Sequence, residues 1–84
     1  MDCTRWWVYV LRSIAEPQQR YVGMTSDLER RWSEHNASHT HHTARYAPWR
    51  IIVTIGFDDS QRAAGFEKYL KSGSGRAFIT RHFE

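Results

Sequence analysis

Three short runs of aromatic and β-branched residues, divided by segments with helical spacing, limit this chain to a small mixed fold. The runs are Trp6–Leu11, Arg20–Met24 and Ile51–Phe57, and each has the composition of a strand. Pro17 marks a turn between the first two runs. Residues 6–24 are therefore predicted to form a hairpin with a rather long loop.

Helices are predicted in the segments that separate and follow these strands. In chain order they run from the capping residues 25–27 to about Asn36, from the capping residues 58–60 to Lys71, and from Arg76 to Phe83. Ser72–Gly75 is predicted to break the second helix from the third. The order β-β-α-β-α-α predicts a small three-stranded, mainly antiparallel sheet flanked by helices, an α/β or α+β sandwich.

Length and composition narrow the functional classes. Eighty-four residues, 40% of them hydrophobic, predict a single domain over residues 1–84 with a thin core. One cysteine, Cys3, excludes an internal disulfide framework. No signal peptide or membrane-spanning stretch is visible, so a cytoplasmic protein without membrane contact is expected. A net charge of +3 and a pI near 9.4 favour polyanionic partners only modestly.

Polar side chains lie on or beside helical faces that should be apolar. Leu28, Trp32 and His35 form one stripe, with Leu28 and Trp32 as the expected core contacts. Arg31 lies at the edge of this stripe and points the same way as His35. The ordinary interpretation is an extended arginine stem beside a satisfied boundary histidine. The other charged residues of this helix are expected on solvated surface: Arg30 and Glu34.

The second helix carries a carboxylate at the edge of its apolar stripe. Ala63, Phe66 and Leu70 form that stripe, and Glu67 sits beside it. A carboxylate in this position needs a partner, because burying it unpaired is costly. The partner is either a divalent metal or one of the cations Lys68, Lys71 and Arg31.

Two short motifs on the predicted hairpin carry a resemblance. Trp7-Val8-Tyr9 followed by Tyr21-Val22-Gly23 resembles the paired motif that names the GIY-YIG nuclease family. In the first motif only the tyrosine is kept, whereas the second departs only by valine for isoleucine. The resemblance covers nearly the whole chain and is closest to the small stand-alone bacterial members.

Further residues match the family one by one. Its essential arginine follows ten residues after the second tyrosine, which selects Arg31, and His35 falls where many members carry a histidine. Ala64–Lys71 looks like the helix that bears the metal-binding glutamate, matching Glu67. Many relatives carry an asparagine after that helix. Here Ser72 and Ser74 are the alternatives for its hydrogen-bonding place.

The resemblance implies a metal-dependent endonuclease that hydrolyses DNA phosphodiester bonds, without excluding RNA. Catalytic roles fall on Tyr9, Tyr21, Arg31, His35 and Glu67. Glu67 would hold one Mg²⁺ or Mn²⁺, because Mg²⁺ often takes only one or two protein carboxylates and keeps several waters. Arg31 suits the scissile phosphate, since its planar fork donates two hydrogen bonds. The base is either a tyrosine assisted by His35, or His35 itself with a tyrosine orienting the water.

The segment between the first helix and the third strand interleaves basic, histidine and aromatic residues. Expected nucleic-acid contacts are Arg31, His39, His41, His42, Arg45, Trp49 and Arg76. Trp49 would alternatively close the core, and the histidines, together with His35, would alternatively bind zinc. No sequence-reading module is present, so cleavage directed by DNA structure, with single-stranded or branched DNA preferred, is expected.

Two other functions compete with the nuclease. One is a non-catalytic nucleic-acid-binding module on the same fold. The other is an interaction domain that uses Trp6, Trp7 and Trp49 as an exposed apolar patch. A monomer or weak homodimer is expected.

Overall fold

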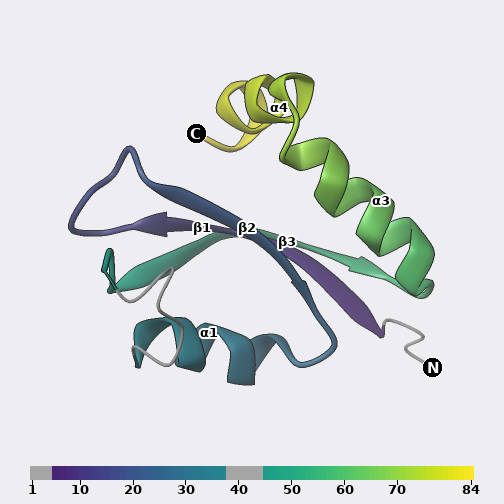
Figure 1. The fold of residues 1–84 in the computed structure, drawn as a ribbon, viewed down its shortest axis with the longest axis horizontal. Helices are drawn as coiled ribbons and strands as arrows, with labels where there is room; N and C mark the ends of the chain where they lie inside the picture. The colour runs from purple at the N-terminus through teal and green to yellow at the C-terminus, as the bar shows by residue number, and fades with distance from the viewer. Residues whose placement is uncertain (1–4, 38–44) are drawn as a thin grey trace.

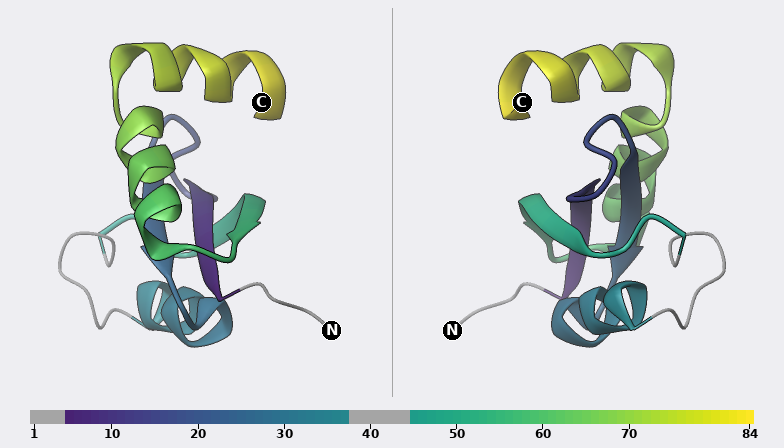
Figure 2. Two further views of the ribbon diagram at one scale, coloured as in Figure 1. Left: turned by 90° about the vertical axis from the view of Figure 1, so that its right-hand side faces the viewer. Right: turned by 90° about the vertical axis from the view of Figure 1, so that its left-hand side faces the viewer.

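A computed structural model describes residues 5–37 and 45–84, which form a three-stranded sheet with helices on both faces (Figures 1 and 2). The elements, in chain order, are β1 (Trp6–Ser13), β2 (Arg20–Thr25), α1 (Leu28–Asn36), β3 (Trp49–Phe57), α3 (Ser60–Leu70) and α4 (Gly73–Phe83). β1 lies in the centre and pairs antiparallel with both neighbours, in the order β2-β1-β3. The predicted fold class and element order are confirmed.

The alternation of side chains along β1 divides the core between the two faces of the sheet. Val8 and Val10 point toward α3 and α4, where they join a buried cluster completed by Ala63, Leu70 and Ile79. Tyr9 and Leu11 point toward α1 and form a second buried cluster with Trp49. We call these two clusters the α3–α4 core and the α1 core. Figures 1 and 2 show α1 on one side of the sheet and α3 and α4 on the other.

A β-bulge adapts β3 to this two-sided core. Val10 pairs with Val53 and Leu11 pairs with Ile51, so Ile52 is an extra residue on β3. The bulge interrupts the alternation of the strand, because two residues oppose one on the partner. Ile52 and Val53 consequently both pack against the α3–α4 core, while Ile51 packs against the α1 core.

Side chains at the predicted capping sites begin the helices. The Asp27 carboxylate accepts a hydrogen bond from the backbone N–H of Arg30 at 3.2 Å, and Asp59 accepts one from Gln61 at 2.9 Å. Each carboxylate satisfies a backbone donor that has no partner within the helix and lies at the positive end of the helix dipole. Among the described residues, no helix is long and apolar enough to cross a lipid bilayer.

The sequence-based prediction was wrong about Trp32. This side chain is 37% exposed, and its indole N–H donates to the backbone oxygen of Trp49 at 3.1 Å. The residue of α1 that is fully buried is His35, while Leu28 packs at the border of the α1 core. The indole spans the junction between α1 and β3, where its polar edge has a partner and its ring stays partly in water.

The third helix was predicted three residues too short. It begins at Gly73 instead of Arg76, because the Ser72 hydroxyl accepts a hydrogen bond from the Gly75 N–H at 3.2 Å. The same hydroxyl donates to the Tyr69 carbonyl at 2.5 Å. Ser72 therefore joins the end of α3 to the start of α4, and the glycine-rich segment is mostly the first turn of a helix.

Gly75 lies where the backbone of α4 comes close to the end of α3, which leads to a prediction about stability. A Cβ at this position would lie 2.6 Å from the carbonyl carbon of Tyr69 and would also collide with Leu70 Cα. Gly75→Ala is expected to lower the free energy of unfolding by about 1–3 kcal/mol, as overpacking against rigid atoms does. Urea denaturation followed by circular dichroism measures this loss.

Gly73→Ala is the matched control, because nothing lies within 4 Å of a Cβ built there. It should leave stability unchanged or raise it by up to about 1 kcal/mol, since alanine restricts the unfolded chain. Equal effects of the two substitutions would contradict the close approach at Gly75.

Candidate active site

The two tyrosines of the hairpin lie on the α1 face of the sheet. Tyr9 comes from β1 and Tyr21 from β2, and their ring centroids are 6.2 Å apart. Gly23 is the residue of β2 directly opposite Tyr9. A Cβ there would lie 2.5 Å from Tyr9 Cζ and 2.9 Å from Tyr21 Cε1. Glycine at this position therefore lets the Tyr9 ring lie across the neighbouring strand and reach α1.

His35 of α1 completes a cluster of three rings. Its Nε2 lies 3.0 Å from the Tyr9 hydroxyl, and both side chains are buried, at 0% and 1% exposure. The Tyr21 ring packs beside it, with 4.7 Å between the ring centroids. A buried polar pair of this kind is stable only when hydrogen-bonded. The expected grouping of Tyr9, Tyr21 and His35 is present in the structure.

Arg31 lies one helical turn before His35 and brings a positive charge to the cluster. Its side chain is 33% exposed, and its Nη1 donates to Glu34 Oε1 at 3.1 Å. Burial acts to lower the pKa of Arg31, but hydrogen bonds to Glu34 and to the Tyr9 and Tyr21 hydroxyls outweigh it and raise that pKa. The guanidinium stays charged and still has donors to spare, because it carries five N–H groups.

Glu34 differs from the sequence-based prediction. It was expected on solvated surface, yet it pairs with Arg31 and lies 3.9 Å from Arg30 Nε. At three residues' separation a carboxylate and a guanidinium are helix neighbours, so the contact was visible in the sequence as an i, i+3 spacing. Glu34 therefore accepts from one part of the Arg31 guanidinium, while other N–H groups of Arg31 reach the tyrosine hydroxyls.

Glu67 of α3 carries a partly shielded carboxylate. Its side chain is 25% exposed, and Oε2 accepts a hydrogen bond from Lys71 Nζ at 3.3 Å. Of the three cations considered, Lys71 is the partner. The pair contributes at most about 1 kcal/mol, because the lysine is 53% exposed. A divalent ion would displace such a contact at little cost. Burial is the main cause of the raised pKa of Tyr9, and the charge of Glu67 adds to it, so the two groups lie within electrostatic range of each other.

Burial keeps the buried pair neutral. It raises the pKa of Tyr9 to about 12, although the nearby Arg31 guanidinium works in the opposite direction. Burial, followed by repulsion from Arg31, lowers the pKa of His35 below its usual 6.5. At neutral pH the imidazole is therefore uncharged and able to accept the proton of the Tyr9 hydroxyl.

Comparison of the sequence with known proteins agrees with the resemblance that the site residues carry. Residues 5–79 match the model of the GIY-YIG catalytic domain. The chain belongs to the GIY-YIG family.

Individual relatives of this GIY-YIG domain include two proteins named as endonuclease subunits. It is 34% identical over 82 residues to the structure-specific endonuclease subunit SLX1 of Candida dubliniensis, covering 89% of this chain and 27% of that one. To the protein of the same name from Malassezia globosa it is 36% identical over 63 residues, covering 70% and 14%. This chain thus spans about a quarter or less of the length of these relatives.

A solved structure has a similar fold. The solution structure of the UPF0213 protein BH0048 from Bacillus halodurans matches with a TM-score of 0.55 and 24% identity, over 90% of this chain and 82% of the other. At this identity the likeness concerns the fold alone.

The expected nucleic-acid contacts of the GIY-YIG domain divide into three groups. Arg45 and Arg76 are exposed, and the Arg45 guanidinium lies 5.6 Å from the centre of the Tyr46 ring. Trp49 is 3% exposed within the α1 core, so its ring cannot stack on a base and the core alternative is correct. His39, His41 and His42 lie outside the described residues, so zinc binding by them stays a prediction.

Ser72 and Ser74 are the two alternatives for the hydrogen-bonding place of the family asparagine. Ser72 caps α4, and Ser74 lies on α4 in a small hollow with Tyr69 and Phe78. The predicted tryptophan patch does not form, because Trp49 is buried in the α1 core while Trp6 packs against the α3–α4 core. Gly23 belongs to the second sequence motif, but its role in positioning Tyr9 depends on strand register, which the sequence does not show.

The lowered pKa of His35 predicts a pH dependence of stability. The unfolded chain binds the proton more readily than the folded one, so the folded state loses stability as pH falls below about 6.5. Urea midpoints should therefore rise between pH 5 and pH 7 and then level off. His35→Gln should flatten this rise, because glutamine does not titrate. A rise of unchanged size in that variant would assign the pH dependence to other groups.

Proposed function

We propose that this chain is a metal-dependent endonuclease that cleaves DNA phosphodiester bonds and selects its substrate by DNA structure. The observation that carries the proposal is the cluster of Arg31 and the Tyr9–His35 pair, within electrostatic range of Glu67, in a chain that belongs to the GIY-YIG family. Structure-directed cleavage is supported by relatives whose names describe structure-specific endonuclease subunits.

The donor set fits one hard divalent ion. Glu67 is a single carboxylate, and the described residues hold no group of three His, Cys, Asp or Glu side chains able to form a closed metal site. Mg²⁺ binds in this way, through one or two carboxylates, waters and substrate phosphate, whereas structural zinc takes four protein ligands. When bound to Glu67, Mg²⁺ or Mn²⁺ would neutralise charge on the phosphate and on the leaving oxygen.

Arg31 would hold the scissile phosphate. Its guanidinium is fixed by Glu34 on one side and lies beside the tyrosine hydroxyls on the other. A cation held in place before the reaction stabilises the charge that develops on the phosphate without reorganising solvent. The phosphate would therefore sit against the tyrosines, whose hydroxyls would position a water to attack it.

The Tyr9–His35 pair would take the proton of that water. A free Tyr9 phenolate would cost about 7 kcal/mol at pH 7, since burial raises the pKa of its hydroxyl to about 12. That cost is avoided when the hydroxyl gives its proton to His35 Nε2 as it receives one from the water. Tyr21, packed against His35, would orient the water.

A cleavage assay tests the proposed function. Labelled single-stranded, double-stranded and branched DNA are incubated with the protein in Mg²⁺, in Mn²⁺ and in EDTA. Cutting is expected with either metal, is faster on branched or single-stranded DNA than on duplex, and is absent in EDTA. An Arg31→Ala protein purified in parallel controls for a contaminating nuclease. Binding without cutting in every metal would instead support the non-catalytic binding module.

A further inference from the structure

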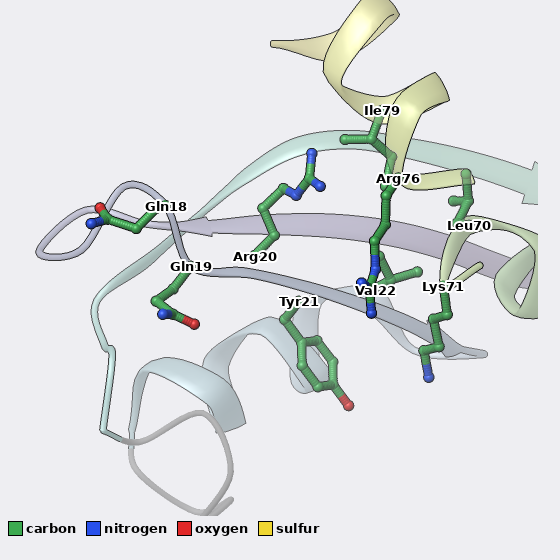
Figure 3. Close-up of a pocket in the computed structure, with 9 residues that line it drawn as sticks. All are labelled: Gln18, Gln19, Arg20, Tyr21, Val22, Leu70, Lys71, Arg76 and Ile79. Atoms are coloured by element: carbon green, nitrogen blue, oxygen red, sulfur yellow. The ribbon is translucent and has the colours of Figure 1, made fainter. Parts of the chain in front are cut away.

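A cationic groove opens beside the candidate active site, between β2 and α4. It has a volume of about 660 Å³ and is lined by Gln18, Gln19, Arg20, Tyr21, Val22, Leu70, Lys71, Arg76 and Ile79. Three of these residues are cations and none is a carboxylate. In Figure 3 the lining residues of the hairpin lie on one side of the hollow, and those of α4 and of the end of α3 lie on the other. A hollow with this charge favours an anionic ligand.

The three cations are not equally available to a ligand. Arg20 is held by Glu84 at 2.8 Å and by the Thr80 hydroxyl at 3.3 Å, so it ties β2 to α4. Lys71 pairs with Glu67 through a contact that is half exposed and easily exchanged. Within residues 5–37 and 45–84, no carboxylate lies within 4 Å of the Arg76 guanidinium. Arg76 and Lys71 are therefore the groups that can bind phosphate.

The groove is continuous with the candidate active site. Tyr21 lines it and also packs against His35, with 4.7 Å between the ring centroids. Lys71 lines it and also contacts Glu67. A chain of phosphates bound at Arg31 would thus enter the groove past Tyr21, and the next cations it would meet are Lys71 and Arg76.

The size of the groove decides between single-stranded and double-stranded nucleic acid. Its volume is that of a small-molecule site. A duplex, whose major groove alone is about 12 Å wide, is too wide to lie within a hollow of about 660 Å³. One strand can enter, because its bases can stack on the Tyr21 ring while its phosphates follow the cations.

We propose that this groove binds a single-stranded segment that continues from the scissile phosphate, an inference that rests on the proposed nuclease function. Lys71 and Arg76 contact its phosphates, and Tyr21 stacks on a base. Gln18 and Gln19 hydrogen-bond to base edges. Each glutamine amide both donates and accepts, so these contacts tolerate any base. The groove therefore selects for an unpaired strand beside the cleavage point and not for a sequence.

A binding experiment tests the groove separately from catalysis. Fluorescence anisotropy of a labelled oligothymidylate is measured in EDTA, over a range of salt concentrations, for wild type and for Lys71→Ala/Arg76→Ala. The double variant should bind at least about tenfold more weakly, since even one hydrogen bond to a charged group is worth about that factor. The slope of log affinity against log salt should fall by about 0.7 per lost phosphate contact.

Two further variants keep this test specific. Arg50→Ala/Arg62→Ala also removes two exposed cations, from β3 and from the start of α3, and should leave the salt slope unchanged. Arg76→Ala alone does not disturb the Glu67 pair and should lower the slope by about 0.7. Equal losses of affinity in the groove variant and in this control would overturn the proposal.

Cleavage distinguishes failure of the groove from failure of the nuclease. Wild type should cut a duplex with a single-stranded extension faster than a blunt duplex of the same sequence, and Arg76→Ala should bring the ratio of the two rates toward one. Normal cutting with an unchanged ratio would overturn the groove alone. Absence of cutting, with binding that still depends on Arg76, would overturn the nuclease and support the groove.

Discussion

Replacing Arg31 with alanine should slow DNA cleavage by about 100- to 1,000-fold, the usual cost of removing one fixed group that stabilises transition-state charge. The substitution removes a cation whose hydrogen bonds reach the Tyr9 and Tyr21 hydroxyls. It should not unfold the protein, because the side chain is 33% exposed and its ion pair with Glu34 is worth at most about 1 kcal/mol. Cleavage rates at saturating metal, with circular dichroism as a check on folding, measure the effect.

Lysine should not restore the activity lost at position 31. A guanidinium can hold Glu34 and a phosphate on different edges, whereas an ammonium group is a single compact charge that must choose between them. Arg30→Ala is the matched control. The Arg30 side chain is 73% exposed, and its Nε lies 3.9 Å from Oε2 of the same Glu34 carboxylate. A loss in Arg30→Ala as large as that in Arg31→Ala would show that the arginine was assigned to the wrong position.

Replacing Glu67 with glutamine should reduce metal-dependent cleavage by at least about 1,000-fold, since a bound metal contributes several kcal/mol to the transition state. Glutamine keeps the shape of the side chain but loses the charge that a divalent ion needs. The loss of the ion pair with Lys71 should cost little stability, because that lysine is half exposed. Any fall in cleavage can therefore be assigned to the site and not to unfolding.

Two measurements make the Glu67 prediction specific to metal binding. Glu16→Gln, an equal change of charge at an exposed turn residue, should leave cleavage unaffected. Water-proton relaxation with Mn²⁺ should detect binding to wild type and much weaker binding to Glu67→Gln. Wild-type levels of both cleavage and Mn²⁺ binding in the variant would rule out Glu67 as the metal ligand.

Those parts of the fold that depend on local pattern could be predicted from the sequence. The three strands are runs of β-branched and aromatic residues, and Asp27 and Asp59 cap helices as their side chains predict. Tyr9, Tyr21 and His35 could be grouped because the motif spacing pointed to one site. Their contact distances depend on strand pairing and helix packing, which follow from the whole fold.

What could not be predicted depends on three-dimensional context. Trp32 and Trp49 are chemically alike, and only the structure shows that the first is partly exposed while the second is buried. The start of α4 at Gly73 depends on the Ser72 hydroxyl finding both the Gly75 N–H and the Tyr69 carbonyl. The overpacking expected in Gly75→Ala depends on how closely α4 approaches the end of α3, which no local pattern specifies.

The division of the core between the two faces of the sheet limits how this protein can change. Tyr9 and His35 are among its largest fully buried side chains, and both lie on the α1 side as a candidate part of the active site. At either of these two positions, a substitution that improves packing would remove a side chain of the proposed active site. Natural drift and laboratory stabilisation should therefore both concentrate on the α3–α4 core, whose aliphatic residues can be exchanged without touching the chemistry.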